Sequence, residues 1–430
     1  MSRDHDGSTP ESAAAESTPD PDPDPDADRG AETAGSGSGD GSAPLAPSER
    51  VARTPPSGIR RFFELASEMD DVISLGVGEP DFSAPYGARE AAITSLQQGR
   101  TSYTANRGMS RLREAIADHV RRYDLSYDPD EEILVTAGAS EAIDVAFRAF
   151  CDPGDTVAIA QPCYVSYEPG VRFAGGQPLA VPTRASDEFT LTREALESAG
   201  AAAADLLVYC YPNNPTGATM GRDDLAEVAA FCREHDVAVL ADEIYAALTY
   251  AGEHTSIATL PGMSERTVVF NGFSKAYAMT GLRLGYALGP PDAIDAMNRV
   301  HQYTMLSAPT TAQYAALEAL DSCWPEVEEM RTQYDRRRRF VLARLREMGL
   351  DPFEATGAFY AFPEAPGGDA GAFAEALLEA ERVAVVPGDA FGAGGAGHLR
   401  LSYATGLDDL REAMDRMERF LAAGPFSPDG

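Results

Sequence analysis

Short apolar runs alternate with amphipathic stretches along most of this 430-residue chain. Runs of this length are typical of buried strands, and the stretches between them repeat apolar residues at helical spacing. The alternation predicts an α/β fold with a mostly parallel sheet flanked by helices, because parallel strands need crossover helices and are buried on both faces. The predicted strands are residues 132–136, 156–160, 206–211, 237–241, 267–271 and 284–288, and the clearest predicted helices are residues 111–123 and 222–235.

The two ends of the chain differ from this middle. Residues 1–46 are rich in Asp, Pro, Ser, Gly and Ala and hold too few large apolar groups to offset the entropy of ordering, so we expect a disordered acidic tail. A long charged helix, short strands and a final helix after residue 326 predict a smaller α+β unit. We therefore expect a large domain over residues 85–325 and a small domain made of residues 47–84 and 326–430.

The chain is strongly acidic, with a formal charge of −33. The first fifty residues hold 12 acidic and three basic side chains, so a charge of −24 belongs to the rest of the chain. Such a surface repels nucleic acid and anionic membranes, and we expect neither as a partner. Because molar salt screens this repulsion, we interpret the charge as an adaptation to a cytoplasm of very high salt.

The five cysteines show no spacing typical of zinc or redox sites, and several lie in apolar stretches. We expect reduced core residues, no metal site and a cytoplasmic protein. No stretch approaches eighteen consecutive apolar residues, and the N-terminus lacks the basic and apolar regions of a signal peptide.

Lys275 is the only lysine of the chain, beside 34 arginines. A protein of this length ordinarily carries roughly two dozen lysines. Arginine replaces lysine as a surface charge, but its guanidinium stays protonated and cannot condense with a carbonyl to form a Schiff base. Either compositional drift left one lysine by chance, or amine chemistry is irreplaceable at Lys275, and the residues around it favour the second interpretation.

Polar residues and tight turns follow several predicted strands, where ligands of parallel sheets collect. Small residues between Thr136 and Ser140 open a helix, which suits a phosphate at the exposed amides but also suits any tight turn. The segment from Tyr211 to Gly217 holds Asn214 between two prolines, and its alternative is a plain turn.

Asp242 directly follows an apolar strand, and a buried carboxylate needs a cation or a donor as partner. Its neighbours allow structural roles, since Glu243 suits a helix cap and Tyr245 suits ordinary packing. Lys275 follows the next strand, with Ser274 beside it and Arg283 eight residues on. Apolar walls and Arg283 lower the pKa of such an amine, which keeps part of it unprotonated near neutral pH.

These four segments, together with Gly76–Phe82 and Arg400–Thr405, resemble the class I aminotransferases, fold type I enzymes that use pyridoxal 5′-phosphate. The resemblance runs from about residue 57 to residue 421 and includes six motifs in order. Residues 57–63 and 357–405 look most like archaeal enzymes of the aromatic and aspartate type. In the phosphate turn, Ala139 and Ser140 depart from the glycine or lysine of many relatives, and Tyr164 replaces a tryptophan or phenylalanine.

The resemblance implies a role for each motif residue. Lys275 would bind the cofactor as an internal aldimine and later move the substrate's Cα proton, and Asp242 would keep the pyridine nitrogen protonated. Arg400 would grip the substrate α-carboxylate, with the Gly78 amide, Tyr164 and Asn214 beside it. The remaining cofactor contacts would come from Asn214 and Tyr245 at the ring oxygen, Tyr164 on the ring face, and Ala139, Ser140, Ser274, Arg283 and a second subunit's Tyr103 at the phosphate.

The implied function is transfer of an amino group between an amino acid, aromatic or aspartate, and 2-oxoglutarate, by a homodimer with shared active sites. Arg60, Arg61 and Arg107 are candidates to meet a distal carboxylate, although each also suits a solvated surface charge. One alternative is another reaction on the same cofactor, such as β-elimination of a cysteine conjugate. Another is a regulator that kept the fold without turnover. DNA-binding regulators of this fold carry an added basic helix-turn-helix domain, and the acidic tail is too short and of the wrong charge for one.

We predict that the thermal unfolding midpoint is higher in molar potassium chloride than in dilute buffer. Mutual repulsion among the acidic side chains opposes compaction, and at about 1 M salt the screening length falls to roughly 3 Å. Thermal melts across a potassium chloride series measure this. Equal or greater stability in dilute buffer would contradict the salt interpretation.

Overall fold

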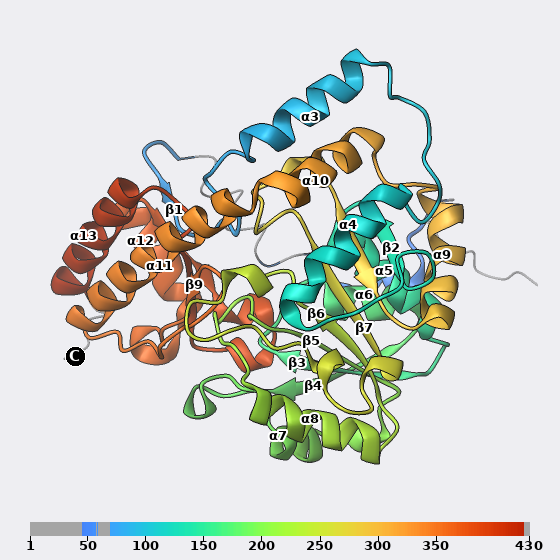
Figure 1. Ribbon diagram of the computed structural model, residues 1–430. Coiled ribbons are helices and arrows are strands. Elements are labelled where there is room, and N and C mark those ends of the chain that lie inside the picture. The colour runs from blue at the N-terminus through green and yellow to red at the C-terminus, as the bar shows by residue number, and fades with distance from the viewer. Residues whose placement is uncertain (1–44, 57, 59–68, 425–430) are drawn as a thin grey trace, which may run out of the picture. The chain divides into compact units, whose positions relative to one another are not determined.

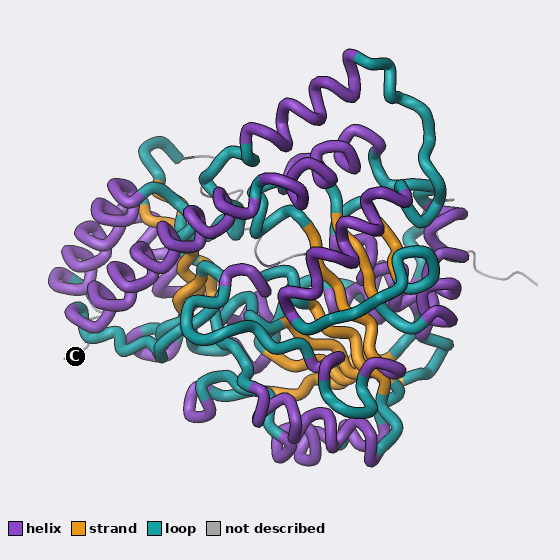
Figure 2. The backbone as a smooth tube through the Cα atoms, viewed as in Figure 1, coloured by secondary structure: helices purple, strands orange, loops and turns teal. Residues whose placement is uncertain are grey.

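The computed structural model describes residues 45–56, 58 and 69–424. At its centre lies a seven-stranded sheet of order β2-β8-β7-β6-β5-β3-β4, with helices packed around it (Figures 1 and 2). The strands are β2 (Ile133–Thr136), β3 (Thr156–Gln161), β4 (Gln177–Pro182), β5 (Leu206–Cys210), β6 (Ala238–Asp242), β7 (Thr267–Gly272) and β8 (Gly285–Leu288). This architecture confirms the predicted α/β class.

The sheet is parallel except at β8, which runs antiparallel to both β2 and β7. The link from β7 to β8 holds one short 3-10 turn and no crossover helix, and only an antiparallel strand is reached over so short a connection. The edge strand β4 was not among the predicted strands. Most of its residues are partly or fully exposed, so its sequence lacks the apolar run that marks the central strands.

Helices cover the sheet. Helix α5 packs against β7 and β8 and against two neighbouring helices, α6 and α9, while α10 packs along α3 and α4 (Figure 1). The predicted helices at 111–123 and 222–235 correspond to α4 and α8. In this part of the chain the helices are α1 (Glu49–Ala52), α3 (Tyr86–Gln97), α4 (Ser110–Val120), α5 (Ala139–Phe150), α6 (Tyr167–Ala174), α7 (Arg193–Ala199), α8 (Arg222–Glu234), α9 (Pro291–Thr304) and α10 (Thr310–Ser322).

Two small sheets lie outside the central one. Strand β1 (Ile73–Ser74) pairs in parallel with β10 (Val383–Ala384), and β12 (Leu399–Ser402) lies antiparallel between β11 (Val386–Pro387) and β9 (Tyr360–Ala361). Their helices are α11 (Trp324–Glu347), α12 (Ala370–Glu381) and α13 (Leu407–Ala423). The β1–β10 pair joins the two segments that we assigned to the small domain, and the division into a large and a small domain stays a prediction.

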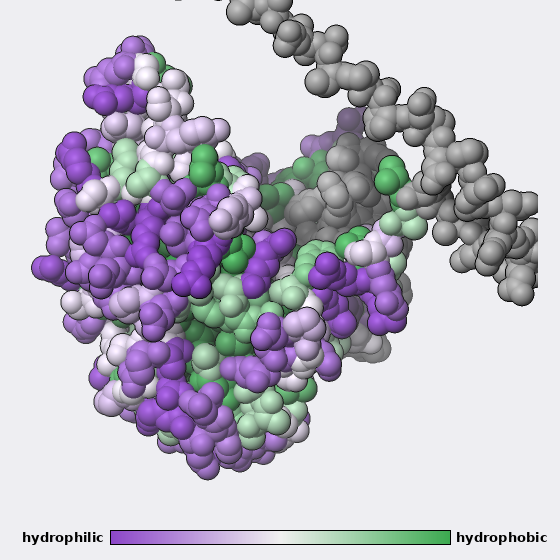
Figure 3. Space-filling view, turned by 90° about the vertical axis from the view of Figure 1, so that its right-hand side faces the viewer, coloured by the Kyte–Doolittle hydropathy of each residue, from purple (hydrophilic) through white to green (hydrophobic). Residues whose placement is uncertain are grey.

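By its contacts the chain divides after Pro47, and the predicted disordered tail lies almost wholly outside the described residues. Hydrophilic residues cover much of the face drawn in Figure 3, with hydrophobic residues gathered toward its middle. All five cysteines are buried and free. Among the described residues, no helix is long and apolar enough to cross a membrane, and no group of His, Cys, Asp and Glu is placed to hold a metal ion.

We predict that Phe147→Ala lowers the free energy of unfolding by about 3–5 kcal/mol, the range for removing a buried aromatic ring. The Phe147 side chain on α5 is fully buried against α6, where a Cβ at Gly170 would come within 2.9 Å of its ring. Phe173→Ala is the matched control, because Phe173 on α6 is 38% exposed, and we expect a loss near 1 kcal/mol. Urea unfolding measures the free energy of unfolding of both variants. Equal losses in the two variants would contradict the burial of Phe147 between α5 and α6.

Candidate active site

A cavity of about 400 Å³ opens at the carboxyl ends of β5, β6 and β7, beside the first turn of α5. Parallel neighbours in the sheet end on the same edge, so residues that leave these three strands meet there. The lining residues are Gly76, Val77, Gly78, Glu79, Ala139, Ser140, Ile143, Tyr164, Cys210, Asn214, Asp242, Ile244, Tyr245, Ser274, Lys275, Thr280, Arg283, Tyr360 and Arg400.

The Lys275 amine lies inside this cavity, three residues beyond the end of β7. Its Nζ donates a hydrogen bond to the Gly78 carbonyl oxygen at 2.6 Å. Burial, followed by the positive charge of Arg400, lowers the pKa of Lys275 to about 8. The chain therefore keeps its one lysine where the amine is a nucleophile at mildly alkaline pH.

The carboxylate of Asp242 is buried at the last position of β6. Its Oδ2 accepts a hydrogen bond of 2.6 Å from the Tyr167 hydroxyl, and its Oδ1 accepts one of 3.1 Å from the Ile244 amide. Burial raises the pKa of Asp242 to about 6, although the Tyr167 hydrogen bond opposes that rise. Near neutral pH the carboxylate is ionised in a poorly solvated place, where a cation would stabilise it strongly.

Arg400 is a second cation that lines the cavity; its side chain is buried and enters from β12. Its guanidinium donates to the Asn214 side-chain oxygen at 3.0 Å and to the Gly76 carbonyl, and it lies over the rings of Tyr360 and Phe391. The Nε–H group of Arg400 is buried without a hydrogen-bond partner in the described structure. A planar guanidinium group with an unused N–H donor at a cavity suits a carboxylate ligand.

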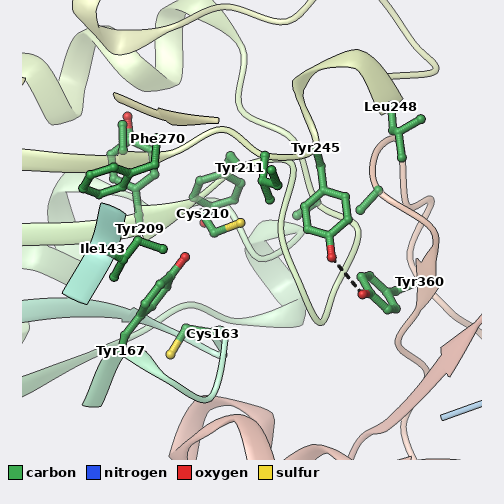
Figure 4. Packing of buried hydrophobic residues seen from close by; sticks show 14 of the residues in the cluster. Ile143, Cys163, Tyr167, Tyr209, Cys210, Tyr211, Tyr245, Leu248, Phe270 and Tyr360 are labelled. Carbon is green, nitrogen blue, oxygen red and sulfur yellow. Dashed lines mark hydrogen bonds between the residues drawn. The ribbon is translucent and has the colours of Figure 1, made fainter. Parts of the chain in front are cut away.

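The hydroxyls of Tyr245 and Tyr360 lie 2.9 Å apart, one leaving the end of β6 and the other on β9 (Figure 4). This contact fixes both phenols at the cavity wall. A Cβ at Gly78 would overlap the Tyr360 hydroxyl, so only glycine lets the segment with the Gly78 carbonyl come so close to Lys275.

The first turn of α5 forms the other end of the cavity. Gly138 takes a φ of 91°, and a Cβ there would lie 2.9 Å from Nη2 of Arg283. The first amides of a helix have no carbonyl partner within it, and Ala139 and Ser140 line the cavity together with Arg283 and Ser274. Free amides, a helix dipole and a guanidinium in one place suit a phosphate.

The structure brings all but one of the predicted site residues to this cavity. The exception is Tyr103, which is 79% exposed and lies outside the lining. Arg107, a candidate for a distal carboxylate, is instead ion-paired with Asp295 and bonded to the carbonyls of Asp130 and Glu131. Arg60 and Arg61 lie outside the described residues.

Glu243 does not cap a helix, the alternative role that we allowed it. Its buried carboxylate accepts a hydrogen bond of 2.6 Å from the Ser256 hydroxyl and lies 2.8 Å from Nε2 of His254. The side chains of Asp242 and Glu243 alternate to opposite sides of the extended chain, which explains why only Asp242 lines this cavity.

Sequence reasoning missed two tyrosines of the site, Tyr167 and Tyr360. Tyr167 lies three residues after Tyr164, and its hydroxyl reaches Asp242 only because α6 begins there. Tyr360 lies among the short strands expected after residue 326, yet its contact with Tyr245 spans 115 residues. A tyrosine in an apolar segment gives no sign of which distant hydroxyl or carboxylate it will meet.

Comparisons with known proteins place this geometry in a family. The sequence profile described as "Aminotransferase class I and II" matches residues 70–417. An aspartate aminotransferase of Pyrococcus abyssi is 45% identical over 383 residues, covering 88% of this chain and 98% of the relative. An aromatic-amino-acid aminotransferase of Thermococcus litoralis is 43% identical over 383 residues, with the same coverage. The protein belongs to the class I and II aminotransferases.

The crystal structure of an aromatic aminotransferase from Pyrococcus horikoshii superimposes with a TM-score of 0.80 at 45% identity, covering 85% of this chain and 98% of that one. The predicted enzyme class is confirmed, and the protein is an amino acid aminotransferase that uses pyridoxal 5′-phosphate. The cavity fits this cofactor. It offers an amine for the aldehyde, a buried carboxylate for the ring nitrogen, and unpaired helix amides with a guanidinium for the phosphate.

We predict that Lys275 in the cofactor-free protein reacts with an amine reagent at a rate that reaches half its maximum near pH 8. Burial and the Arg400 charge disfavour the ammonium form, so the free amine appears about 2.5 pH units earlier than for an exposed lysine. Because the chain has one lysine, peptide mapping separates its label from that of the N-terminal amine. Lys275→Arg removes the lysine label as a control, and a midpoint above pH 10 would contradict the buried setting.

Proposed function

We propose that this aminotransferase exchanges the amino group of an aromatic amino acid or aspartate with 2-oxoglutarate. The observation that carries the proposal is one cavity whose lining includes Lys275, Asp242 and Arg400. The names of the relatives from Pyrococcus abyssi and Thermococcus litoralis support the two substrate classes. Glutamate and 2-oxoglutarate form the common second pair.

Pyridoxal phosphate, when bound, withdraws electrons from the substrate's amine-bearing carbon. In this proposal Asp242 keeps the ring nitrogen protonated, because the buried carboxylate gains a cation in addition to its hydrogen bonds from Tyr167 and Ile244. Tyr245 and Asn214 hold the ring's oxygen, and Tyr164 packs on the ring face. Ala139, Ser140, Ser274 and Arg283 hold the phosphate.

Lys275 anchors the cofactor and moves the proton at the substrate Cα. The pKa of about 8 supports this role, since a base acts best when its pKa lies near the working pH. Arg400 holds the substrate α-carboxylate through its unused donor, and the Gly78 amide lies beside that place. With the carboxylate fixed at Arg400, the substrate Cα is held on the side of the cavity where Lys275 lies.

We further propose a homodimer in which Tyr103 of the partner subunit reaches the phosphate. Tyr103 is 79% exposed, and Tyr303, Met305 and Leu306 at the end of α9 are exposed as well. The Asn106 side chain donates to the Leu306 carbonyl at 2.7 Å, so these two segments are adjacent. Exposed aromatic and apolar side chains in one place are typical of an interface.

The five free, buried cysteines support a reducing compartment, and we propose the cytoplasm.

A panel of amino donors with 2-oxoglutarate in molar salt tests the function. We expect phenylalanine, tyrosine, tryptophan or aspartate to form one glutamate for each 2-oxo acid produced, because the cavity binds both carboxylates at Arg400 in turn. Lys275→Arg is the matched control and is expected to abolish turnover, since a guanidinium cannot replace the amine.

Cysteine conjugates go through the same assay, with ammonia and pyruvate measured beside glutamate. Faster release of ammonia and pyruvate than of glutamate would replace the transaminase proposal with a β-lyase. Cofactor binding without turnover of any donor would instead favour a regulator that kept the fold.

A further inference from the structure

Glu141 and His301 form a buried pair directly behind the first turn of α5. Nδ1 of His301, from α9, lies 2.6 Å from Oε1 of Glu141, and the His301 side chain is fully buried. An ionised carboxylate only accepts hydrogen bonds, so the proton lies on Nδ1. The lining of the active-site cavity includes Ala139, Ser140 and Ile143 of this helix, and the Glu141 side chain points away from it toward α9.

The second oxygen of Glu141 reaches back along the chain. Oε2 accepts a hydrogen bond from the Ala137 amide, in the turn that precedes the helix. Gly138 in the same turn donates its amide to the Thr136 carbonyl at 2.8 Å, and its own carbonyl accepts the Thr136 hydroxyl at 3.0 Å. The amides of Ala137 and Gly138 thus both have hydrogen-bond acceptors within the protein.

This arrangement decides which amides face the cavity. With the Ala137 and Gly138 amides engaged behind the turn, the next two amides, of Ala139 and Ser140, are the ones left for a ligand at the helix N-terminus. The arrangement resembles a capping box, except that the acidic side chain binds the amide one residue before the N-cap. A negative charge in the first turn also competes with a bound anion, and the His301 contact holds that charge behind the turn.

We infer that Glu141 and His301 are positioning residues that set the cofactor's phosphate affinity by orienting the turn from Ala137 to Ser140. The inference rests on the proposed assignment of the phosphate to this turn. Neither residue touches the cofactor in this assignment, so their effect appears in the phosphate-dependent part of binding. It does not appear in the reaction of the Lys275 amine with the aldehyde.

The test compares two ligands of the full-length, cofactor-free protein, pyridoxal phosphate and pyridoxal, which share the aldehyde and differ in the phosphate. We expect Glu141→Ala to weaken pyridoxal phosphate binding about tenfold, the loss for one hydrogen bond that orients a charged ligand's site, and to leave pyridoxal binding within about twofold. Glu141→Gln keeps an oxygen for the Ala137 amide and is expected to restore most of the affinity. His301→Leu should give a smaller loss in the same direction, and His301→Asn, which keeps a donor, should recover it.

Glu168→Ala is the matched control, because Glu168 lies in the first turn of α6 and pairs only with Arg172 of its own helix among the described ion pairs. It should change neither affinity. Equal weakening of both ligands by Glu141→Ala, or no weakening, would overturn the inference and leave the proposed function standing. Equal affinity of the unmodified protein for pyridoxal phosphate and pyridoxal would overturn both the inference and the assignment of the phosphate to this turn. The panel of amino donors tests the proposed transamination separately.

Discussion

The burial of one carboxylate, that of Asp242, constrains the rest of the site. A buried charge is costly without partners, and β6 places this one at the end of a strand whose last four residues are buried. In the sheet register, Cys210 of β5 and Phe270 of β7 lie opposite Asp242 on either side. The chain leaving each neighbouring strand therefore passes the carboxylate, which brings Asn214 from one side and Lys275 from the other.

The same burial determines the protonation of the groups around it. The low-polarity surroundings that raise the pKa of Asp242 to about 6 lower the pKa of Lys275 to about 8, because each group loses hydration of its charged form. The Tyr167 hydroxyl acts against the first shift by binding the ionised carboxylate. With these two pKa values, one cavity holds an ionised carboxylate at Asp242 and a partly unprotonated amine at Lys275 near neutral to mildly alkaline pH.

Local patterns in the sequence were sufficient for much of this structure. The six predicted strands correspond to β2, β3, β5, β6, β7 and β8, because their apolar runs report burial directly. Lys275, Asp242 and Asn214 were found since each follows such a run. The edge strand β4 was missed because its exposed residues form no apolar run. The Tyr167 bond to Asp242 and the Tyr245–Tyr360 pair could not be predicted because they join residues far apart in the sequence.

In the proposed function, Arg400 links substrate binding to the protonation of Lys275. Its positive charge is one of the causes that lower the pKa of the amine, second after burial. A carboxylate held by Arg400 neutralises that charge, and the repulsion on an ammonium at Lys275 then falls. In the proposed function, binding of the substrate carboxylate would therefore make the Lys275 amine a stronger base when the proton at the neighbouring Cα has to be removed. Under this proposal Arg400 both orients the substrate and adjusts the pKa of the base that acts on it.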